Sequence, residues 1–132
     1  MSKNRTYVMG ATAMALALGG TIALAGTANA ATPQSVCGSG YTVRASHAIG
    51  EGPNARVYLL RDGNRACVVN FKTGGSVGNS VGIGAWVQGL GGSRSADEGA
   101  YKYYAGPVKV TSSCVNWGGN YGPEYRWSNS PC

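Results

Sequence analysis

Four cysteines, Cys37, Cys67, Cys114 and Cys132, constrain the fold of this chain more than any other feature of its sequence. All four follow an N-terminal segment with the features of an export signal, so we expect folding in an oxidising compartment. An even number of cysteines in such a chain predicts two disulfides. The sequence leaves three pairings open. Loop size and a small apolar core favour Cys37–Cys67 and Cys114–Cys132.

A zinc site is the competing explanation for the cysteines. Structural zinc sites usually combine closely spaced cysteine pairs with further cysteines or histidines. No CxxC pair occurs here, and His47 is the only histidine. We therefore expect disulfides, with no metal ion and no cofactor.

The N-terminal 30 residues are expected to be a cleaved signal peptide. Lys3 and Arg5 form a positive end, residues 7–25 carry no charge, and Ala28-Asn29-Ala30 is a small-residue cleavage site. The alternative is a membrane anchor, because the apolar stretch approaches the roughly 20 residues that span a bilayer. Its Ala, Gly and Thr content and the lack of a following charge cluster favour cleavage before Ala31. No membrane association is expected afterwards.

Residues 31–132 have the length of one small domain. Removal of Lys3 and Arg5 lowers the formal net charge of the chain from +6 to +4. The chain has only one Phe and three Trp, so its apolar core is expected to be thin. In the chain-entropy model each disulfide would add about 3–4 kcal/mol of stability to such a domain.

The patterning of residues 31–132 predicts strands almost throughout. Residues 41–49 roughly alternate apolar and polar side chains, as half-buried strands do. Residues 57–60 and 66–71 flank the turn Asp62-Gly63-Asn64, which predicts a hairpin. Further strands are expected over residues 81–90, over 101–112 with a bend at Gly106-Pro107, and over 114–119, and a polar loop is expected over 91–99. The expected fold is an all-β, small antiparallel sandwich or barrel with little helix.

Catalytic chemistry has little support in the sequence. His47 would need a nucleophile and an orienting carboxylate. The candidates are Ser39, Ser76, Ser93, Asp62, Asp97 and Glu98, and no serine lies in a GxSxG elbow. Asp97 and Glu98 are adjacent, so in a strand they would face opposite sides, unlike the paired carboxylates of a glycosidase. We therefore expect no enzymatic activity.

Aromatic residues gather in the last third of the chain. They are Tyr101, Tyr103, Tyr104, Trp117, Tyr121, Tyr125 and Trp127, with Lys102, Lys109 and Arg126 between them. One interpretation places part of this set in the core. The other is an exposed surface for polysaccharide or protein contact, with Trp117, Tyr125, Arg126 and Trp127 as its binding residues. A net charge of +4 on an exported protein does not favour nucleic acid, and anionic wall polymers are the expected electrostatic partner.

Four segments resemble the spore-associated protein A family, small secreted proteins of sporulating, filamentous actinobacteria. They are CGSGYTV from Cys37, the hairpin VYLL…NRACVV, DEGAYKYYAGPV over residues 97–108, and CVNWGG over 114–119. The resemblance implies export and association with the surface of the spore or aerial hypha. It carries no catalytic residues to this chain.

Two functions are consistent with these features. The first is a secreted, non-enzymatic protein of the spore or cell surface that binds wall or spore-coat material through an aromatic and basic surface. The second is a secreted inhibitor or toxin-like effector that acts on an extracellular enzyme, with residues 125–127 as its anchor. An enzyme ranks third, because no catalytic motif is present.

Overall fold

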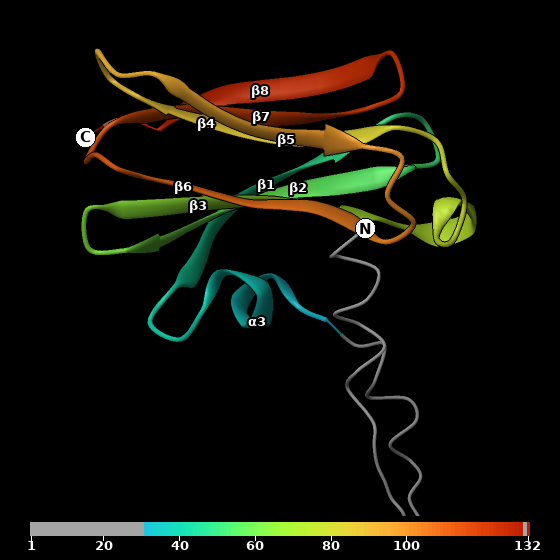
Figure 1. Cartoon of the computed structure of the whole chain (residues 1–132), viewed down its shortest axis with the longest axis horizontal. Helices are drawn as coiled ribbons and strands as arrows, with labels where there is room; N and C mark the ends of the chain where they lie inside the picture. The colour runs from blue at the N-terminus through green and yellow to red at the C-terminus, as the bar shows by residue number, and fades with distance from the viewer. Residues whose placement is uncertain (1–30, 131) are drawn as a thin grey trace, which may run out of the picture. The chain divides into compact units, whose positions relative to one another are not determined.

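Two antiparallel sheets form the framework of the protein in a computed structural model that describes residues 31–130 and 132 (Figure 1). The first sheet has the strand order β1-β2-β3-β6 and the second β5-β4-β7-β8. In chain order the elements are α3 (Pro33–Cys37), β1 (Thr42–Ile49), β2 (Ala55–Asp62), β3 (Arg65–Lys72), the 3-10 turn η3 (Gly74–Ser76), β4 (Ile83–Gly89), β5 (Arg94–Gly99), β6 (Tyr104–Thr111), β7 (Val115–Tyr121) and β8 (Glu124–Ser130). The prediction of an all-β antiparallel fold with little helix is confirmed.

The expected signal peptide at residues 1–30 lies outside the described residues and stays a prediction. Within the part of the chain that the structure describes, no helix has the length and apolar character needed to cross a bilayer.

The β2–β3 hairpin lies at the centre of the first sheet. Asp62 and Arg65 pair at its end, and the chain reverses through Gly63 and Asn64 between them. Gly63 has φ = 63°, a left-handed conformation that glycine adopts at little cost. Most of β3 is buried on both of its faces. The first sheet is therefore covered on two sides.

The main core lies between the two sheets. Its largest buried side chains come from the inward faces of both sheets and include Ile49, Leu59, Val68, Val87 and Trp117. This alternation of inward apolar residues is the ordinary way in which two sheets form a sandwich.

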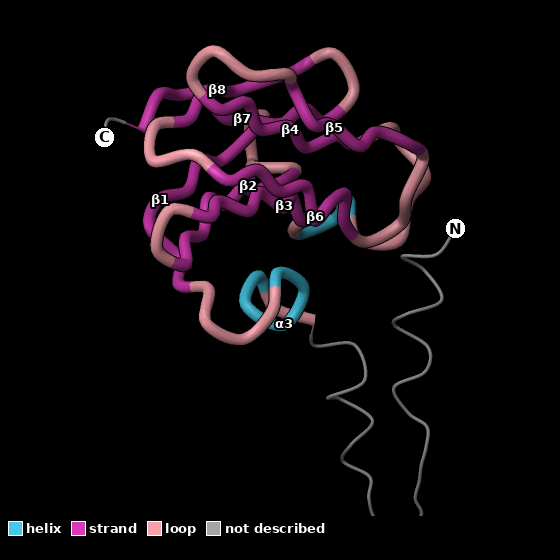
Figure 2. The backbone as a smooth tube through the Cα atoms, turned by 60° about the vertical axis from the view of Figure 1, so that its left-hand side comes forward, coloured by secondary structure: helices cyan, strands magenta, loops and turns pink. Residues whose placement is uncertain are grey.

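A second, smaller core covers the outer face of the first sheet. Cys37 of α3 and Tyr41 pack there against Leu60, Val69 and Tyr104. Figures 1 and 2 show α3 on the side of the first sheet that faces away from the second sheet. The segment from α3 to Tyr41 thus serves as a cover for this sheet.

Both predicted disulfides are confirmed. Cys37–Cys67 joins α3 to β3, and Cys114–Cys132 joins the residue before β7 to the end of the chain after β8. No free cysteine is found in the described residues.

The prediction of a loop over residues 91–99 is wrong for Arg94–Gly99, which form β5. Residues Arg94–Gly99 pair with β4 along their whole length, and their exposure alternates from one residue to the next. The segment RSADEG has few residues that favour strands, so pairing with β4 decides its conformation over local propensity.

The expected strand over residues 101–112 begins later, at Tyr104. It runs through Gly106-Pro107 with an irregular register opposite Val68 and Asn70. A Cβ at Gly106 would lie 2.7 Å from the Val68 carbonyl oxygen, and Gly106 has φ = 98°. The strand therefore requires glycine at this irregularity.

Candidate binding site on the second sheet

Two tryptophans face outward from neighbouring parts of the second sheet. Ala85 and Val87 of β4 point into the core, so Trp86 points outward between them. Trp86 pairs with Gly118 of β7, and Gly118 pairs with Trp127 of β8. Directly paired residues share one face of a sheet. The two tryptophan positions are therefore two strand spacings apart, roughly 10 Å, with no side chain between them.

The next row on this face is polar at its centre. Gly84 of β4 pairs with Glu98 on one side and Asn120 on the other, and Asn120 pairs with Tyr125 of β8. The Nδ2 of Asn120 donates a hydrogen bond to Glu98 Oε2 at 3.1 Å. A Cβ at Gly84 would collide with Asn120 Oδ1 and lie 3.2 Å from Glu98 Cγ. Glycine at position 84 thus gives these two polar side chains room to meet.

The side chains of these rows border a groove of about 570 Å³ that crosses all four strands. We call it the tryptophan groove and define it by Arg94, Trp86, Glu98, Asn120, Tyr125 and Trp127. Its volume lies within the range of small-ligand sites.

Asn70 of the first sheet supports the groove from beneath. Its side chain is fully buried, and its Nδ2 donates to the carbonyl oxygens of Gly84 at 2.8 Å and Asn120 at 3.1 Å. A Cβ at Gly119 would lie 2.8 Å from the same nitrogen. The backbone under the groove is therefore fastened to β3 across the core.

The charges in the groove are few and oppose one another. The guanidinium carbon of Arg94 lies 3.9 Å from the centre of the Trp86 ring, a close cation–π contact. Glu98 carries the opposite charge one row away. By contrast, the basic groups of Arg65 and Lys109 lie over the ring of Tyr41, which packs on the first sheet. At the groove a basic group meets an aromatic ring in the Arg94–Trp86 contact, and Arg126 also borders the groove.

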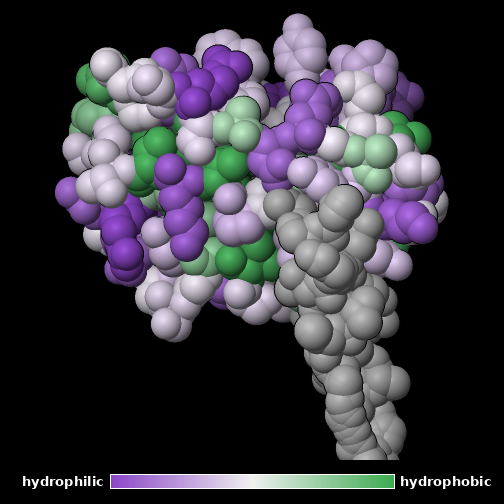
Figure 3. Space-filling view, viewed as in Figure 1, coloured by the Kyte–Doolittle hydropathy of each residue, from purple (hydrophilic) through white to green (hydrophobic). Residues whose placement is uncertain are grey.

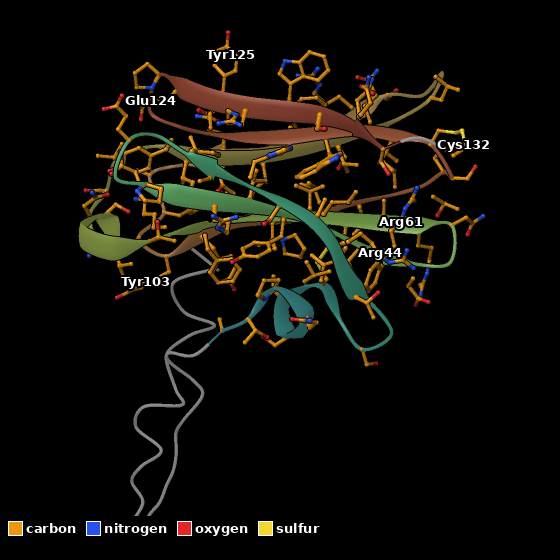
Figure 4. All side chains as sticks on the ribbon, turned by 180° about the vertical axis from the view of Figure 1, so that it is seen from behind. Arg44, Arg61, Tyr103, Glu124, Tyr125 and Cys132 are labelled. Carbon is orange, nitrogen blue, oxygen red and sulfur yellow. A yellow bond between two sulfur atoms is a disulfide. The ribbon has the colours of Figure 1, made fainter. Side chains whose placement is uncertain are left out.

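Tyr125 and Trp127 are two of the binding residues predicted from the sequence. They are 69% and 57% exposed, and both border the groove. Figure 4 shows Tyr125 projecting from β8 away from the first sheet. Arg126, between them, is exposed, and its Nη1 lies 3.5 Å from the carbonyl oxygen of Ala48 in β1. Its guanidinium is thus directed toward the first sheet and away from its two neighbours.

The inclusion of Trp117 in this surface is wrong. Its side chain is 1% exposed and belongs to the main core. Trp117 and Gly118 are adjacent in β7, so they face opposite sides of the sheet, and Gly118 is the position that pairs with Trp127.

Sequence reasoning missed Trp86 and Arg94, and it considered Glu98 only as a catalytic carboxylate. Gly84 and Trp86 are two residues apart in VGIGAWVQGL, and this spacing places them on one face of a strand. That signal was sufficient to find Trp86. Arg94 and Glu98 could not be assigned to the same sheet face as Trp86 while their segment was interpreted as a loop.

His47 has no catalytic partners in the described structure. Its ring stacks on Trp117 with centroids 5.1 Å apart and an angle of 15° between the planes. Its Nε2 is buried without a hydrogen-bond partner. Burial lowers the pKa of His47 below its usual value, and the positive charges of Arg126 and Arg56 lower it further. Both effects favour the neutral imidazole, and its charged neighbours are arginines.

The candidate carboxylates and the buried serine have structural contacts. Asp97 accepts hydrogen bonds from the Tyr101 hydroxyl at 2.7 Å and from the backbone N–H of Gly106 at 2.9 Å. Asp62 forms an ion pair with Arg65 at the hairpin turn. The Ser76 hydroxyl donates to the carbonyl oxygen of Thr73 in its own loop and to that of Asn54 in the β1–β2 connection. Among residues 31–130 and 132, no group of three His, Cys, Asp or Glu side chains could hold a metal ion.

The face of the molecule in Figure 3 shows hydrophobic and hydrophilic residues intermixed outside the area covered by grey atoms. This view offers no broad, continuous apolar surface to compete with the tryptophan groove as a binding site.

Comparison with known proteins assigns the family. No family model matches the chain, and no solved structure matches it. The chain is 36% identical over 116 residues to spore-associated protein A of Streptomyces coelicolor, covering 82% of this chain and 73% of the relative. The resemblance seen in the four sequence segments is therefore confirmed over most of the chain. This protein belongs to the spore-associated protein A family.

Proposed function

We propose that this protein is exported, has no enzymatic activity, and stays at the spore or cell surface by binding wall or spore-coat material through the tryptophan groove. The observation that carries the proposal is the exposure of Tyr125 and Trp127 beside Trp86 at one groove. Aromatic side chains of this size are frequent anchors in recognition sites. A single exposed aromatic residue needs no such explanation, but two exposed aromatic residues beside the half-buried Trp86 at one groove do.

The location at a surface is supported by the family and by the disulfides. The relative in Streptomyces coelicolor is named for its association with spores. Two disulfides suit a protein that works outside the cytoplasm, because thiols there are oxidised.

The lack of enzymatic activity is supported by the surroundings of His47. A catalytic histidine of the hydrolase type is oriented by a carboxylate. The charged groups that act on His47 are Arg126 and Arg56, which oppose protonation. The candidate carboxylates Asp62 and Asp97 have structural contacts elsewhere.

Fractionation of a sporulating culture tests the proposal. We expect the protein to remain with washed spores, and Trp127→Ala to move most of it into the medium. Leu90→Ala is the matched control, because Leu90 is 78% exposed but lies outside the groove. Equal retention of both variants would remove the groove from the proposal. A parent protein found only in the medium would favour the alternative, a secreted inhibitor of an extracellular enzyme.

A further inference from the structure

We infer that the tryptophan groove binds an uncharged polysaccharide, specifically a chain of β-linked pyranose units, across the strands of the second sheet. The inference rests on the proposed function, since it names the chemical class of the wall or coat material. Three properties of the groove carry it: the placement of its rings, its polar groups and its balance of charge.

The rings provide the first argument. A β-linked pyranose unit presents broad C–H faces, and these pack well on exposed aromatic rings. Trp86 and Trp127 face the same side, roughly 10 Å apart across two strand spacings. Trp127 is exposed, while Trp86 is half-buried with the Arg94 guanidinium against its ring. Tyr125 extends this wall along β8. Anchors at this separation suit an extended chain of several units better than a single small molecule.

The polar groups provide the second argument. Sugar hydroxyls both donate and accept hydrogen bonds, so a site for them needs acceptors and donors at its surface. Glu98 is an acceptor, while the amides of Asn116 and Asn120 carry both kinds of group. All three border the groove, beside the rings. Glu98 and Asn120 share one hydrogen bond, and a purely apolar ligand would leave the remaining donors and acceptors of these groups without water or a partner.

The charge balance decides between neutral and acidic polymers. Arg94 and Glu98 have opposite charges, Arg94 lies on the face of Trp86, and Glu98 accepts a hydrogen bond from Asn120. The guanidinium of Arg126 is directed toward β1. A polymer of repeating anionic units requires several available cations in a row, and the groove does not provide them. The complementary ligand is uncharged.

A protein partner fits this face less well. A stable protein interface covers about 800 Å² on each side. The large apolar side chains exposed at the groove are only Tyr125 and Trp127, among the residues that the structure describes. The groove also crosses the interior of the sheet, where pairing along β4 and β7 occupies the backbone groups that a peptide strand would use.

Titration of the mature protein with neutral hexasaccharides tests the inference. The probes are cellohexaose and chitohexaose, with polygalacturonate as the anionic comparison, followed by tryptophan fluorescence and calorimetry. We expect one or both neutral chains to bind, and Trp127→Ala to weaken binding roughly tenfold or more. Trp127→Phe should restore part of the affinity, while Leu90→Ala should match the parent. Raising the salt concentration from about 0.01 M to about 0.1 M shortens the range of charge interactions from about 30 Å to about 10 Å, and binding should stay constant.

The outcomes separate the inference from the proposed function. Failure of both hexasaccharides to bind, or binding only of polygalacturonate with a loss at higher salt, overturns the inference. If Trp127→Ala still releases the protein from washed spores in that case, the groove binds another surface component and the proposed function stands. If Trp127→Ala changes neither hexasaccharide binding nor spore retention, both fail.

Discussion

The outer faces of the two sheets differ in what covers them. On the first sheet, α3 and Tyr41 pack over Leu60, Val69 and Tyr104, and a disulfide fastens this cover to β3. On the second sheet, Tyr125 and Trp127 lie exposed beside a groove. A fold of this size has little apolar surface to spare. Aromatic residues that remain uncovered in such a domain therefore point to binding.

The same contrast separates the two tryptophans of the β7–β8 hairpin. Trp117 and Trp127 belong to paired strands, but one fills the core and the other borders the groove. Both residues are tryptophans of the same hairpin, so only the face of the sheet on which each lies distinguishes their roles. Replacing each in turn provides a direct test.

The largest effect is expected for Trp117→Ala. Emptying this buried site should lower the free energy of unfolding by about 3–5 kcal/mol. Urea denaturation followed by circular dichroism measures the loss. A variant as stable as the parent would contradict the assignment of Trp117 to the core.

Removal of the Cys37–Cys67 disulfide, which fastens α3 to β3, should have the next largest effect on stability. The paired variant Cys37→Ala/Cys67→Ala opens a link between residues 30 positions apart, and in the chain-entropy model this costs about 3–4 kcal/mol. Both cysteines are replaced so that no free thiol remains. Denaturation midpoints provide the measurement, and spore retention corrected for the folded fraction should be unchanged. A selective loss of retention would show that the first sheet also contributes to binding.

A smaller, pH-dependent effect on stability is expected from His47, which stacks on Trp117 of the other sheet. Because the pKa of His47 is lowered in the folded state, the unfolded chain binds more protons as the pH falls through about 6.5. Stability should therefore be highest above that pH and decrease below it, until the folded protein also takes up the proton. His47 is the only histidine, so His47→Gln should remove this part of the pH dependence.

Chemical denaturation of both proteins between about pH 7 and pH 5 measures the difference. The same variant should retain its binding to spores, since His47 lies outside the tryptophan groove. Identical pH profiles for parent and variant would mean that His47 is free to take up a proton in the folded state.

The smallest effect on stability is expected for Trp127→Ala. An exposed residue outside special backbone positions usually changes the free energy of unfolding by no more than about 0.5 kcal/mol. The melting temperature should therefore stay close to that of the parent while spore retention falls. A large loss of stability, comparable with that of Trp117→Ala, would place Trp127 among the structural residues and remove the contrast between the two faces.

Much of the fold was predictable because its signals are local. Turn residues between two β-rich segments located the β2–β3 hairpin, and the number and spacing of cysteines led to both disulfides. Arg94–Gly99 has no such local signal. Its conformation depends on pairing with β4, a neighbour that the segment's own composition does not specify.

The site was predictable only in part, for a related physical reason. Alternation shows that Trp117 and Gly118 face opposite sides, but it does not show which side is the core. That choice depends on the second sheet packing against β1, β2 and β3. Trp86 lies far from Trp127 in sequence and comes beside it only through the shared neighbour Gly118.

The position of Cys114–Cys132 has a consequence for when the protein can act. β8 is an edge strand with one neighbour, β7, and it carries Tyr125 and Trp127. The β7–β8 hairpin closes at one end through Gly122 and Pro123, and the disulfide closes the other end. Before oxidation, the open end of this edge strand lacks that covalent link and is expected to fray. The β8 side of the groove would thus become fully ordered only after Cys114–Cys132 has formed in an oxidising environment. The reduced chain is therefore expected to have a less ordered β8 than the oxidised chain.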